Sequence, residues 1–314
     1  STISFKTSTT GWGQTKGLNY VFGDNDNNPA QGGALIDAAN PQISWESTEM
    51  VNFGLDAMIG KFSGSLEYYI RNTKDILLKL PIPKIAGLNA PYQNAGSVRN
   101  IGWDLSILHF NKIGDFEYDI TFNLADVKNE ITNLAGTGPY IFSRTIHMVG
   151  QPIGALYGLQ ADGLFKNQSE VDSHAEQFGP VAPGDIRYVD QPTDNDGDGI
   201  IDGPDGIINA KDKVVIGSSI PRYTFGLNLD LRYKGFDFNA FIQGVGKSDG
   251  YLDEHATMAF FMGGTAWEWQ KEDYWTPDNT DASYPRLTFN YPNNEQVSSY
   301  WVRSASYLRF KNLQ

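Results

Sequence analysis

The chain has 314 residues, with 37 Asp and Glu against 24 Lys and Arg, and a formal net charge of −13 at pH 7. This acidic balance argues against nucleic acid as a partner, because the chain has no surplus of basic residues to neutralise phosphates. The sequence contains no cysteine, which excludes disulfide bonds and thiolate metal ligands.

The two ends of the chain do not resemble the ends of a complete protein. The first ten residues, STISFKTSTT, have neither an initiator methionine nor the pattern of a signal peptide. The last nine, SYLRFKNLQ, stop within an alternating pattern. We therefore expect the chain to be a piece of a longer protein.

Alternation of apolar and polar residues with period two predicts three β-hairpins and one further strand. Each alternating segment is about nine to eleven residues long, which is the length that a tilted strand needs to cross a bilayer. The predicted hairpins are 51–70 with a turn at Gly60–Gly64, 101–124 with a turn at Asn111–Asp115, and 223–242 with a turn at Tyr233–Asp237; the last strand begins around Ser306–Lys311.

The segments between the hairpins are much longer than the turns within them. They comprise about 27, 90 and 50 residues, at 72–98, 127–220 and 247–300. Compact soluble domains seldom have such long connections, whereas outer-membrane barrels combine short periplasmic turns with long outward loops. We therefore expect the three turns to face the periplasm and the three long segments to face outward.

Alternating hairpins also form soluble β-sandwiches, in which the apolar face points inward. Two features favour an all-β, transmembrane antiparallel barrel. Aromatic residues recur near strand ends, as in an interfacial girdle: Tyr69, Trp103, Tyr118, Tyr223 and Tyr233. The opposite faces carry residues that suit a wet lumen: Asp56, Glu67, Arg71, Asp230, Arg232, Asp237 and Asn239.

Five stretches, in order, resemble signatures of the SusC/RagA family of TonB-dependent outer-membrane transporters. The resemblance covers nearly the whole chain. The stretches are NPQISWESTEMVNFGLD (40–56), GQPIGALYGLQADGLF (150–165), PGDIRYVD (183–190) followed by INAKDKVVIGSSIPRYTFG (208–226), DYWTPDNTDASYPRL (273–287) and SASYLRFKNLQ (304–314).

This resemblance implies that residues 1–314 form part of the C-terminal half of a 22-stranded barrel, with the N-terminal plug and the last strands outside the chain. It also implies import of oligosaccharides or peptides across the outer membrane of a Gram-negative bacterium of the Bacteroidetes. The implied partners are outer-membrane lipid, a SusD-like surface lipoprotein, and TonB–ExbB–ExbD acting through the missing N-terminal region. One departure is a doubled acidic unit, because DGIINAKD (205–212) repeats the tail of DGIIDGPD (198–205).

No catalytic constellation is visible in the sequence, so we do not expect an enzyme. The four histidines, at 109, 147, 174 and 255, lack metallohydrolase spacing, and neither a Gly-x-Ser-x-Gly elbow nor a phosphate-binding glycine loop is present. The alternative to an importer is a soluble, secreted, calcium-stabilised β-protein that binds glycans at the cell surface.

An aromatic loop, TAWEWQKEDYWTP (265–277), is the best candidate for substrate contact. Trp267, Trp269 and Tyr274 could stack on sugar faces or peptide side chains, because flat rings offer a large contact area with few rotatable bonds. The same rings could instead pack the loop or contact the partner lipoprotein. For Trp275, which lies in a signature of the family, the packing role is favoured.

Residues 194–205, DNDGDGIIDGPD, have the spacing of a twelve-residue calcium loop without flanking helices. Such a loop would bind structural Ca²⁺ weakly, on the order of 10⁻⁴ to 10⁻³ M, because Asp at the last position is shorter than the usual Glu. The alternative is a solvated acidic turn without an ion. The predicted ligands are the side chains of Asp194, Asp196, Asp198 and Asp205, the carbonyl of Ile200 and a water held by Asp202.

Overall fold

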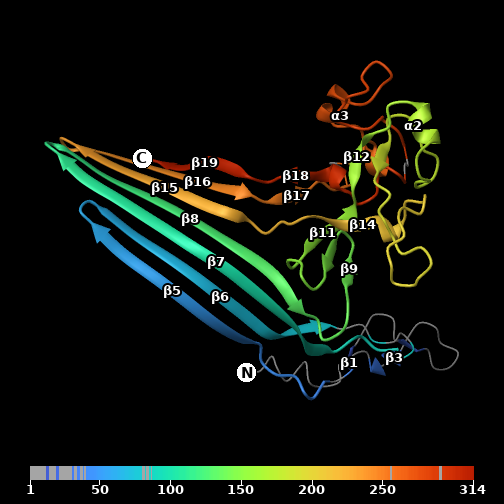
Figure 1. Ribbon diagram of the computed structural model, residues 1–314, viewed down its shortest axis with the longest axis horizontal. Coiled ribbons are helices and arrows are strands. Elements are labelled where there is room, and N and C mark those ends of the chain that lie inside the picture. Colours follow the sequence, from blue (N-terminus) through green and yellow to red (C-terminus); the bar gives the residue numbers. More distant parts are fainter. Residues whose placement is uncertain are drawn as a thin grey trace.

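Seven long strands form one open antiparallel sheet, and the connections between them gather at one end of it (Figure 1). In the remainder of the chain the elements are short. The computed structural model describes residues 12–13, 19–20, 30–31, 34–35, 38, 40–79, 82, 85, 87–254, 257–289 and 292–314.

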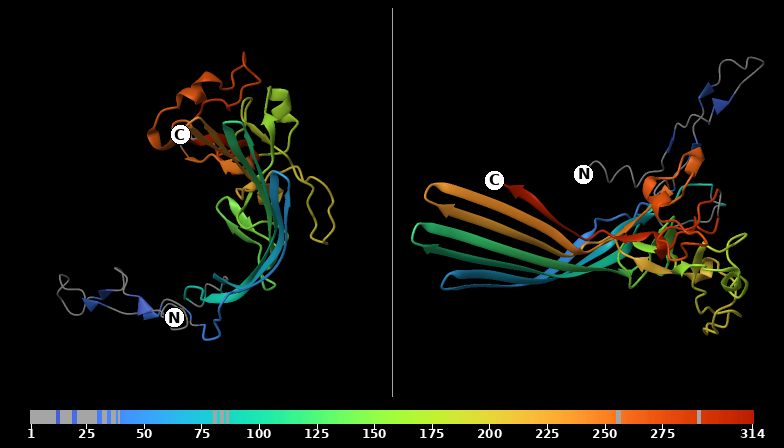
Figure 2. Two further views of the ribbon diagram at one scale, coloured as in Figure 1. Left: turned by 90° about the vertical axis from the view of Figure 1, so that its left-hand side faces the viewer. Right: turned by 90° about the horizontal axis from the view of Figure 1, so that it is seen from above.

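The seven strands follow chain order across the sheet, with β5 and β19 at its edges. The sheet is curved like a section of a barrel wall (Figure 2). Its strands are β5 (Ser47–Ile59), β6 (Phe62–Lys79), β7 (Tyr92–Ile113), β8 (Phe116–Asn133), β15 (Arg222–Tyr233), β16 (Phe236–Lys247) and β19 (Tyr307–Leu313).

The three predicted hairpins and the final strand are all present, and their turns are tighter than predicted. Each turn has two residues: Gly60–Lys61, Gly114–Asp115 and Lys234–Gly235. In the third turn both residues have positive φ, 47° for Lys234 and 86° for Gly235. Two residues with positive φ match the right-handed twist of the flanking strands, which is why such turns dominate short hairpins.

Three strands are much longer than the nine to eleven residues predicted from the alternation. β6, β7 and β8 have 18, 22 and 18 residues. Their extra length lies at the loop end, where strict alternation stops; there Val98, Ile131 and Leu134 form a second, small buried cluster against which Ile76 and Leu78 pack. The connection predicted at 72–98 therefore shrinks to 80–91, part of which lies outside the described residues.

The other two connections form what we call the loop body, residues 134–221 and 248–304. It contains a four-stranded sheet in the order β14-β11-β10-β9 and two pairs of strands, β12 with β13 and β17 with β18. These strands are β9 (Tyr140–Phe142), β10 (Thr145–His147), β11 (Ala155–Leu159), β12 (Ala161–Leu164), β13 (Ile186–Tyr188), β14 (Lys213–Gly217), β17 (Asp249–Tyr251) and β18 (Val302–Ser304).

The helices of the loop body whose bounds are described are single turns. They are α2 (Gln168–Asp172), α3 (Glu268–Glu272) and the 3₁₀ turns η2 (Ala210–Asp212), η4 (Phe261–Gly263) and η5 (Ser299–Trp301). Within the described part of the chain, no helix is both long and apolar enough to cross a membrane. Near the N-terminus, two short strand pairs join β1 (Trp12–Gly13) to β4 (Ala34–Leu35) and β2 (Asn19–Tyr20) to β3 (Ala30–Gln31).

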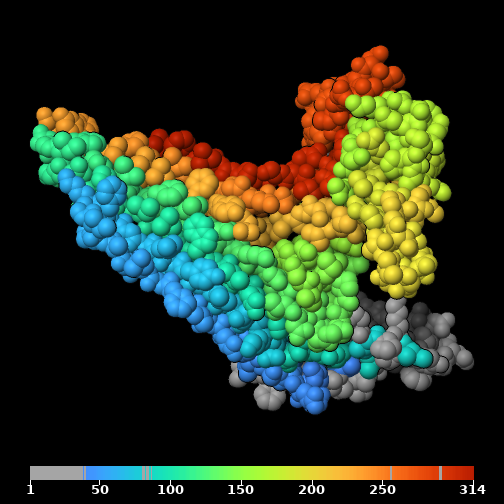
Figure 3. Space-filling model, viewed as in Figure 1, coloured from blue at the N-terminus to red at the C-terminus, as the bar shows by residue number. Residues whose placement is uncertain are grey.

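The main hydrophobic core lies in the loop body, which stands beyond one end of the sheet (Figure 3). Its members come from both halves of the loop body, so the two long connections fold against each other. The buried core residues are Leu159, Leu164, Ile186, Tyr188, Ile208, Trp275, Ala282, Tyr284 and Trp301.

Candidate functional site

The register of the seven strands aligns apolar side chains into rows on one face of the sheet. One row crosses all seven strands through directly opposed residues: Leu55, Leu66, Leu105, Leu124, Phe225, Gly244 and Leu308. Several side chains on this face are exposed, including Phe53 at 69% and Ile59 at 78%. Leaving a large apolar side chain in water costs about 1.5–3 kcal/mol of free energy relative to burying it. A face with many such side chains is therefore expected to contact an apolar surrounding.

The adjacent row lies on the opposite face and is polar across the same seven strands. It consists of Asp56, Ser65, Ser106, Asn123, Gly226, Gln243 and Arg309. All seven residues predicted to line a wet lumen lie on strands of this sheet. The prediction that Tyr69 belongs to an aromatic girdle is wrong. Tyr69 alternates with Glu67 and Arg71 along β6, so it lies on the polar face of the sheet.

The polar face contains a hollow of about 500 Å³ that spans the middle strands. Glu67 and Asp104 line it and are directly opposed in the register of β6 and β7. The amide of Asn52 donates to Glu67 Oε2 at 3.3 Å. Carboxylates, amides and hydroxyls of this kind suit a water-filled passage rather than a protein core.

The predicted aromatic site is divided by the structure. Trp267 and Trp269 remain 56% and 41% exposed at the start of α3, whereas Tyr274 packs against the core and bridges to Tyr284. Gln270, which is fully buried, anchors α3 by accepting a hydrogen bond from the backbone N of Trp267 at 2.9 Å. The two exposed indoles are thus presented on a fixed turn.

Trp275 takes the packing role favoured from the sequence. It is 9% exposed and belongs to the core of the loop body. Gly184 packs directly against its ring: a Cβ on Gly184 would lie 2.5 Å from Trp275 Cε3, and the φ of Gly184 is +91°. Close approach and positive φ together restrict position 184 to glycine.

A buried ion pair, not anticipated from the sequence, ties the two halves of the loop body together. Asp185 is fully buried and accepts from Arg286 Nε at 2.8 Å and Arg286 Nη2 at 3.0 Å. Asn294 and the backbone N of Ala182 also donate to the Asp185 carboxylate, each at 2.9 Å. Asp185 lies in the segment PGDIRYVD, where no local pattern in the sequence indicates a buried ion pair.

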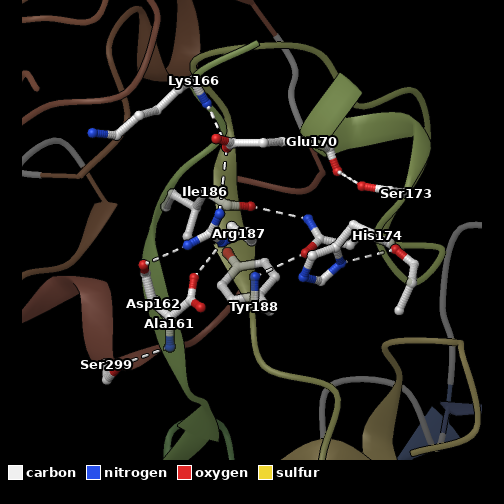
Figure 4. A network of polar contacts seen from close by, with 12 residues as sticks. Ala161, Asp162, Lys166, Glu170, Ser173, His174, Ile186, Arg187, Tyr188 and Ser299 are labelled. Carbon is white, nitrogen blue, oxygen red and sulfur yellow. Dashed lines mark hydrogen bonds and ion pairs between the residues drawn. The ribbon is translucent and has the colours of Figure 1, made fainter. Parts of the chain in front are cut away.

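A second network joins β12, β13 and α2 (Figure 4). Arg187 forms ion pairs with Asp162 and with Glu170, the latter at 3.3 Å, and its hydrogen bond to Asp162 raises the pKa of the guanidinium. The next residue, Tyr188, is fully buried and donates to the carbonyl of Asn293 at 2.6 Å. Burial raises the pKa of Tyr188 far above its usual range, so the phenol stays neutral. These contacts make the loop body a fixed platform.

The acidic loop brings three of its predicted metal ligands together. Carboxylate oxygens of Asp194, Asp196 and Asp202 lie within 4.8 Å of one another. Asp194 accepts from the backbone N of Gly199 at 2.8 Å and of Gly197 at 2.6 Å, and these bonds hold the pKa of its carboxyl below the usual range. Ionised oxygens at this spacing are the donors that Ca²⁺ prefers.

The carboxylates of Asp198 and Asp205 do not belong to this group. Asp198 accepts from the backbone N of Ile200 at 2.7 Å, and Asp205 accepts from the backbone N of Ile207 at 3.0 Å. Asp212, in the second copy of the acidic unit, is buried and accepts from the backbone N of Gln191 and of Asn209. The second copy therefore has a structural use within the loop.

Comparison with known proteins gives relatives over nearly the whole chain, although no protein-family model matches it. TonB-dependent receptor P3 of Formosa agariphila is 30% identical over 307 residues, covering 93% of this chain and 29% of that protein. TonB-dependent receptor P26 of the same organism is 29% identical over 313 residues, covering 96% and 30%. TonB-dependent receptor SusC of Bacteroides thetaiotaomicron is 26% identical, covering 94% and 28%.

Solved structures agree with these relatives. The structure of the RagAB peptide transporter matches with a TM-score of 0.70 and 26% identity, covering 96% of this chain and 32% of that chain. The RagAB peptide importer in its open-open state matches with a TM-score of 0.67 and 25% identity. The chain spans about three tenths of the length of the relatives it matches. These matches confirm the predicted resemblance and the predicted antiparallel barrel fold, of which the seven-stranded sheet is a part.

Proposed function

We propose, from the premise that this chain has the sequence and fold of part of the barrel of a SusC/RagA-type TonB-dependent transporter, that the intact protein imports nutrients across the outer membrane. One observation carries the proposal. Adjacent rows of residues cross all seven strands, one apolar from Leu55 to Leu308 and one polar from Asp56 to Arg309. Such a wall separates lipid from a wet lumen, and nothing in it requires an enzymatic activity.

A soluble glycan-binding protein, the alternative function, would need the apolar row to pack against other protein. The exposure of Phe53 and Ile59 speaks against that arrangement. Soluble monomers rarely expose apolar patches larger than a few hundred Å². We therefore favour the importer.

The partners of the importer follow from the same premise. The relatives carry the name TonB-dependent receptor, and the RagAB structures contain a transporter built with a second protein. We infer that TonB–ExbB–ExbD energises import through a region outside this chain. A SusD-like surface lipoprotein is inferred to dock over the loop body, whose buried ion pair of Asp185 and Arg286 gives it a fixed shape.

The imported solute is inferred to be an oligosaccharide or a peptide. The matched structures are titled as a peptide transporter and a peptide importer. Trp267 and Trp269 offer exposed rings for stacking on either class of solute. Tyr274 is a weaker candidate because it packs against the core of the loop body.

A double substitution, Trp267→Ala with Trp269→Ala, in the full-length transporter tests the role of this loop. Deletion of 265–272 would be less informative, because it would remove the buried Gln270. Exposed tryptophans at binding surfaces commonly contribute more than 1 kcal/mol, so we expect solute uptake or lipoprotein docking to fall at least about fivefold. The matched control is Trp45→Ala, which removes an indole that is 76% exposed outside the loop body. Unchanged uptake and docking would rule out a binding role for the two indoles.

We also propose a structural Ca²⁺ in the acidic loop, bound first by Asp194, Asp196 and Asp202. Asp198, Asp205 and the Ile200 carbonyl would complete the shell only if the loop tightens around the ion. Calorimetry with Ca²⁺ on the full-length transporter should show loss of binding for Asp194→Asn with Asp202→Asn. The variant Asp198→Asn with Asp205→Asn, which removes the same charge, should still bind Ca²⁺ but more weakly than the wild type. Identical binding by all three proteins, or no binding at millimolar Ca²⁺, would leave only an acidic turn.

A further inference from the structure

The four-stranded sheet of the loop body has an open edge at β9. The strand order β14-β11-β10-β9 leaves β9 paired with β10 on one side only. On its other side, no backbone hydrogen bond joins Tyr140–Phe142 to any residue in the described part of the chain. β9 is therefore an edge strand with one side available for pairing.

The register of the hairpin shows which backbone groups point to this open side. The turn between β9 and β10 has two residues, Ser143–Arg144, so the flanking pair, Phe142 with Thr145, exchanges backbone hydrogen bonds. The next pair, Ile141 with Ile146, does not, because the two kinds of pair alternate along an antiparallel ladder. The N–H and C=O of Ile141 consequently point away from β10, to the open side of β9.

This edge lacks the charged side chain or bulge that often protects an exposed strand. Ile141 and Phe142 are 59% and 51% exposed, and no residue of β9 is charged. The opposite edge of the same sheet, β14, begins with Lys213, and all its residues are at least partly buried. An apolar edge with unpaired backbone groups is a template for pairing with another extended chain.

The hairpin of β9 and β10 stands on the polar side of the seven-stranded sheet. Tyr140, at the start of β9, packs against the small cluster that contains Val98 and Ile131. These two residues are directly opposed on β7 and β8, and Val98 lies on the same face of β7 as Asp104, which lines the polar hollow. In the left view of Figure 2, the green segment that contains this hairpin lies on the concave side of the sheet. The open edge therefore lies where a solute would enter a wet lumen.

We propose that the open edge of β9 binds a peptide solute as an added β-strand. The proposal rests on the proposed function, because only an importer brings a solute to this place. Of the two solute classes inferred above, only a peptide has N–H and C=O groups that repeat at the spacing of a strand, so that one of its residues can exchange two hydrogen bonds with Ile141. Recognition through the backbone accepts many sequences. Ile141 and Phe142 would favour β-branched or aromatic side chains in the bound peptide.

Calorimetry with the hexapeptide Lys-Val-Thr-Val-Thr-Lys and the full-length transporter tests the proposal. Ile141→Pro removes the outward N–H and leaves the ladder to β10, because an edge strand tolerates proline where its N–H faces solvent. The matched control, Ile141→Ala, also loses the side chain and keeps the N–H. We expect Ile141→Pro to bind the peptide about fivefold more weakly than Ile141→Ala, the effect of one hydrogen bond. Equal affinities of the two variants, or no binding to the wild type, would overturn the proposal.

Changing the ligand gives a test that does not depend on the folding of a variant. The same hexapeptide methylated at every backbone nitrogen keeps its side chains, has no backbone N–H and should bind the wild type about tenfold more weakly. Hydrogen exchange of residues 138–143 should slow with the unmodified peptide and should not change with a glucose hexasaccharide. Peptide binding that leaves this exchange unchanged, or protection by the hexasaccharide, would contradict peptide pairing at β9.

Two further measurements separate this proposal from the others. If the surface lipoprotein protected residues 138–143 and the peptide did not, the edge would be a protein interface and the proposal would be wrong. Uptake is measured separately in each variant. Peptide uptake that is the same in Ile141→Pro and Ile141→Ala would refute the edge site and leave the importer intact. A wild-type protein that binds the peptide at Ile141 without importing it would refute the importer instead.

Discussion

The seven-stranded sheet and the loop body use the same kinds of residue in opposite ways. On the sheet, Phe53 is 69% exposed and the apolar row lies on the surface. In the loop body, Trp301 is 2% exposed and Tyr188 is fully buried. The loop body therefore has a core of its own, like a water-soluble domain, whereas the sheet depends on an outside apolar phase.

A single all-β chain can thus contain one region whose packing suits water and another whose packing suits an apolar surrounding. In the loop body, the buried carboxylate of Asp185 is paired with Arg286. In the sheet, polar groups are separated from apolar ones by alternation alone, with Asp56 beside Leu55. In the loop body, removing a buried charge should therefore be destabilising, whereas on the apolar face of the sheet adding a charge should be.

The sharpest contrast concerns access to the two ends of the molecule. Lys112 lies at the turn end of the sheet and Thr137 lies in the loop body, and both are exposed. A cysteine is introduced at one or the other of these positions in the full-length transporter, and intact cells are treated with an impermeant thiol reagent. One of the two cysteines should be labelled and the other should not. We expect labelling at Thr137→Cys only. Labelling at Lys112→Cys only would reverse the proposed sidedness.

The next largest effect is expected from Asp185→Ala in the loop body. Removing one partner of a buried ion pair costs up to about 3–5 kcal/mol, and here Asp185 is fully buried while the Arg286 side chain is 24% exposed, so we expect a loss at the lower end of that range. Hydrogen exchange in the full-length protein should show loss of protection around β12 and β13, while the barrel keeps its heat resistance. Asp281→Ala is the control, since its pair with Lys166 is exposed and such pairs contribute less than about 1 kcal/mol. Similar exchange in both variants would contradict this account of the loop body.

A pair of adjacent substitutions tests the sheet. Phe53→Lys places a charge on the apolar face and should destabilise the folded barrel by about 2–4 kcal/mol in lipid bilayers. Asn52→Lys places the same charge on the polar face and should change the free energy of unfolding by less than about 1 kcal/mol. Denaturant unfolding of the full-length protein in lipid vesicles measures both. If Phe53→Lys proved the milder change, the apolar face would not be in lipid.

The smallest expected effect concerns the pKa of His147. Burial lowers that pKa, and the ring packs edge-on against Phe142 at 4.9 Å between centroids. The neutral imidazole therefore contributes stability above the ordinary histidine pKa of about 6.5, and this contribution is lost as the pH falls through the lowered value. The Phe142→Ala variant should raise the NMR titration midpoint of His147. An unchanged midpoint would mean that Phe142 does not shield the ring.

The sequence predicted the sheet well because alternation is a local signal. Three hairpins and the last strand follow from residues two positions apart, and the apolar row from Leu55 to Leu308 confirms them. The same signal missed the extensions of β6, β7 and β8, where bulges interrupt the register and the apolar residues, such as Ile76, Val98 and Ile131, no longer follow strict alternation.

The loop body was not predictable in the same way. Its main contacts join residues far apart in the chain, such as Asp185 and Arg286, 101 positions apart. No local period marks such a pair. In the acidic loop, spacing suggested six ligands, but among the described carboxylates only those of Asp194, Asp196 and Asp202 lie within 4.8 Å of one another. Spacing along the chain does not determine which carboxylate oxygens converge.

The central claim is that one face of the sheet meets lipid and the other meets water. Nitroxide labels placed singly at positions 51 to 56 along β5 of the full-length transporter, reconstituted in lipid vesicles, test it most directly. We expect accessibility to alternate, with labels at 51, 53 and 55 relaxed by oxygen and labels at 52, 54 and 56 relaxed by a water-soluble nickel complex. Equal access of the nickel complex to all six positions would contradict the claim.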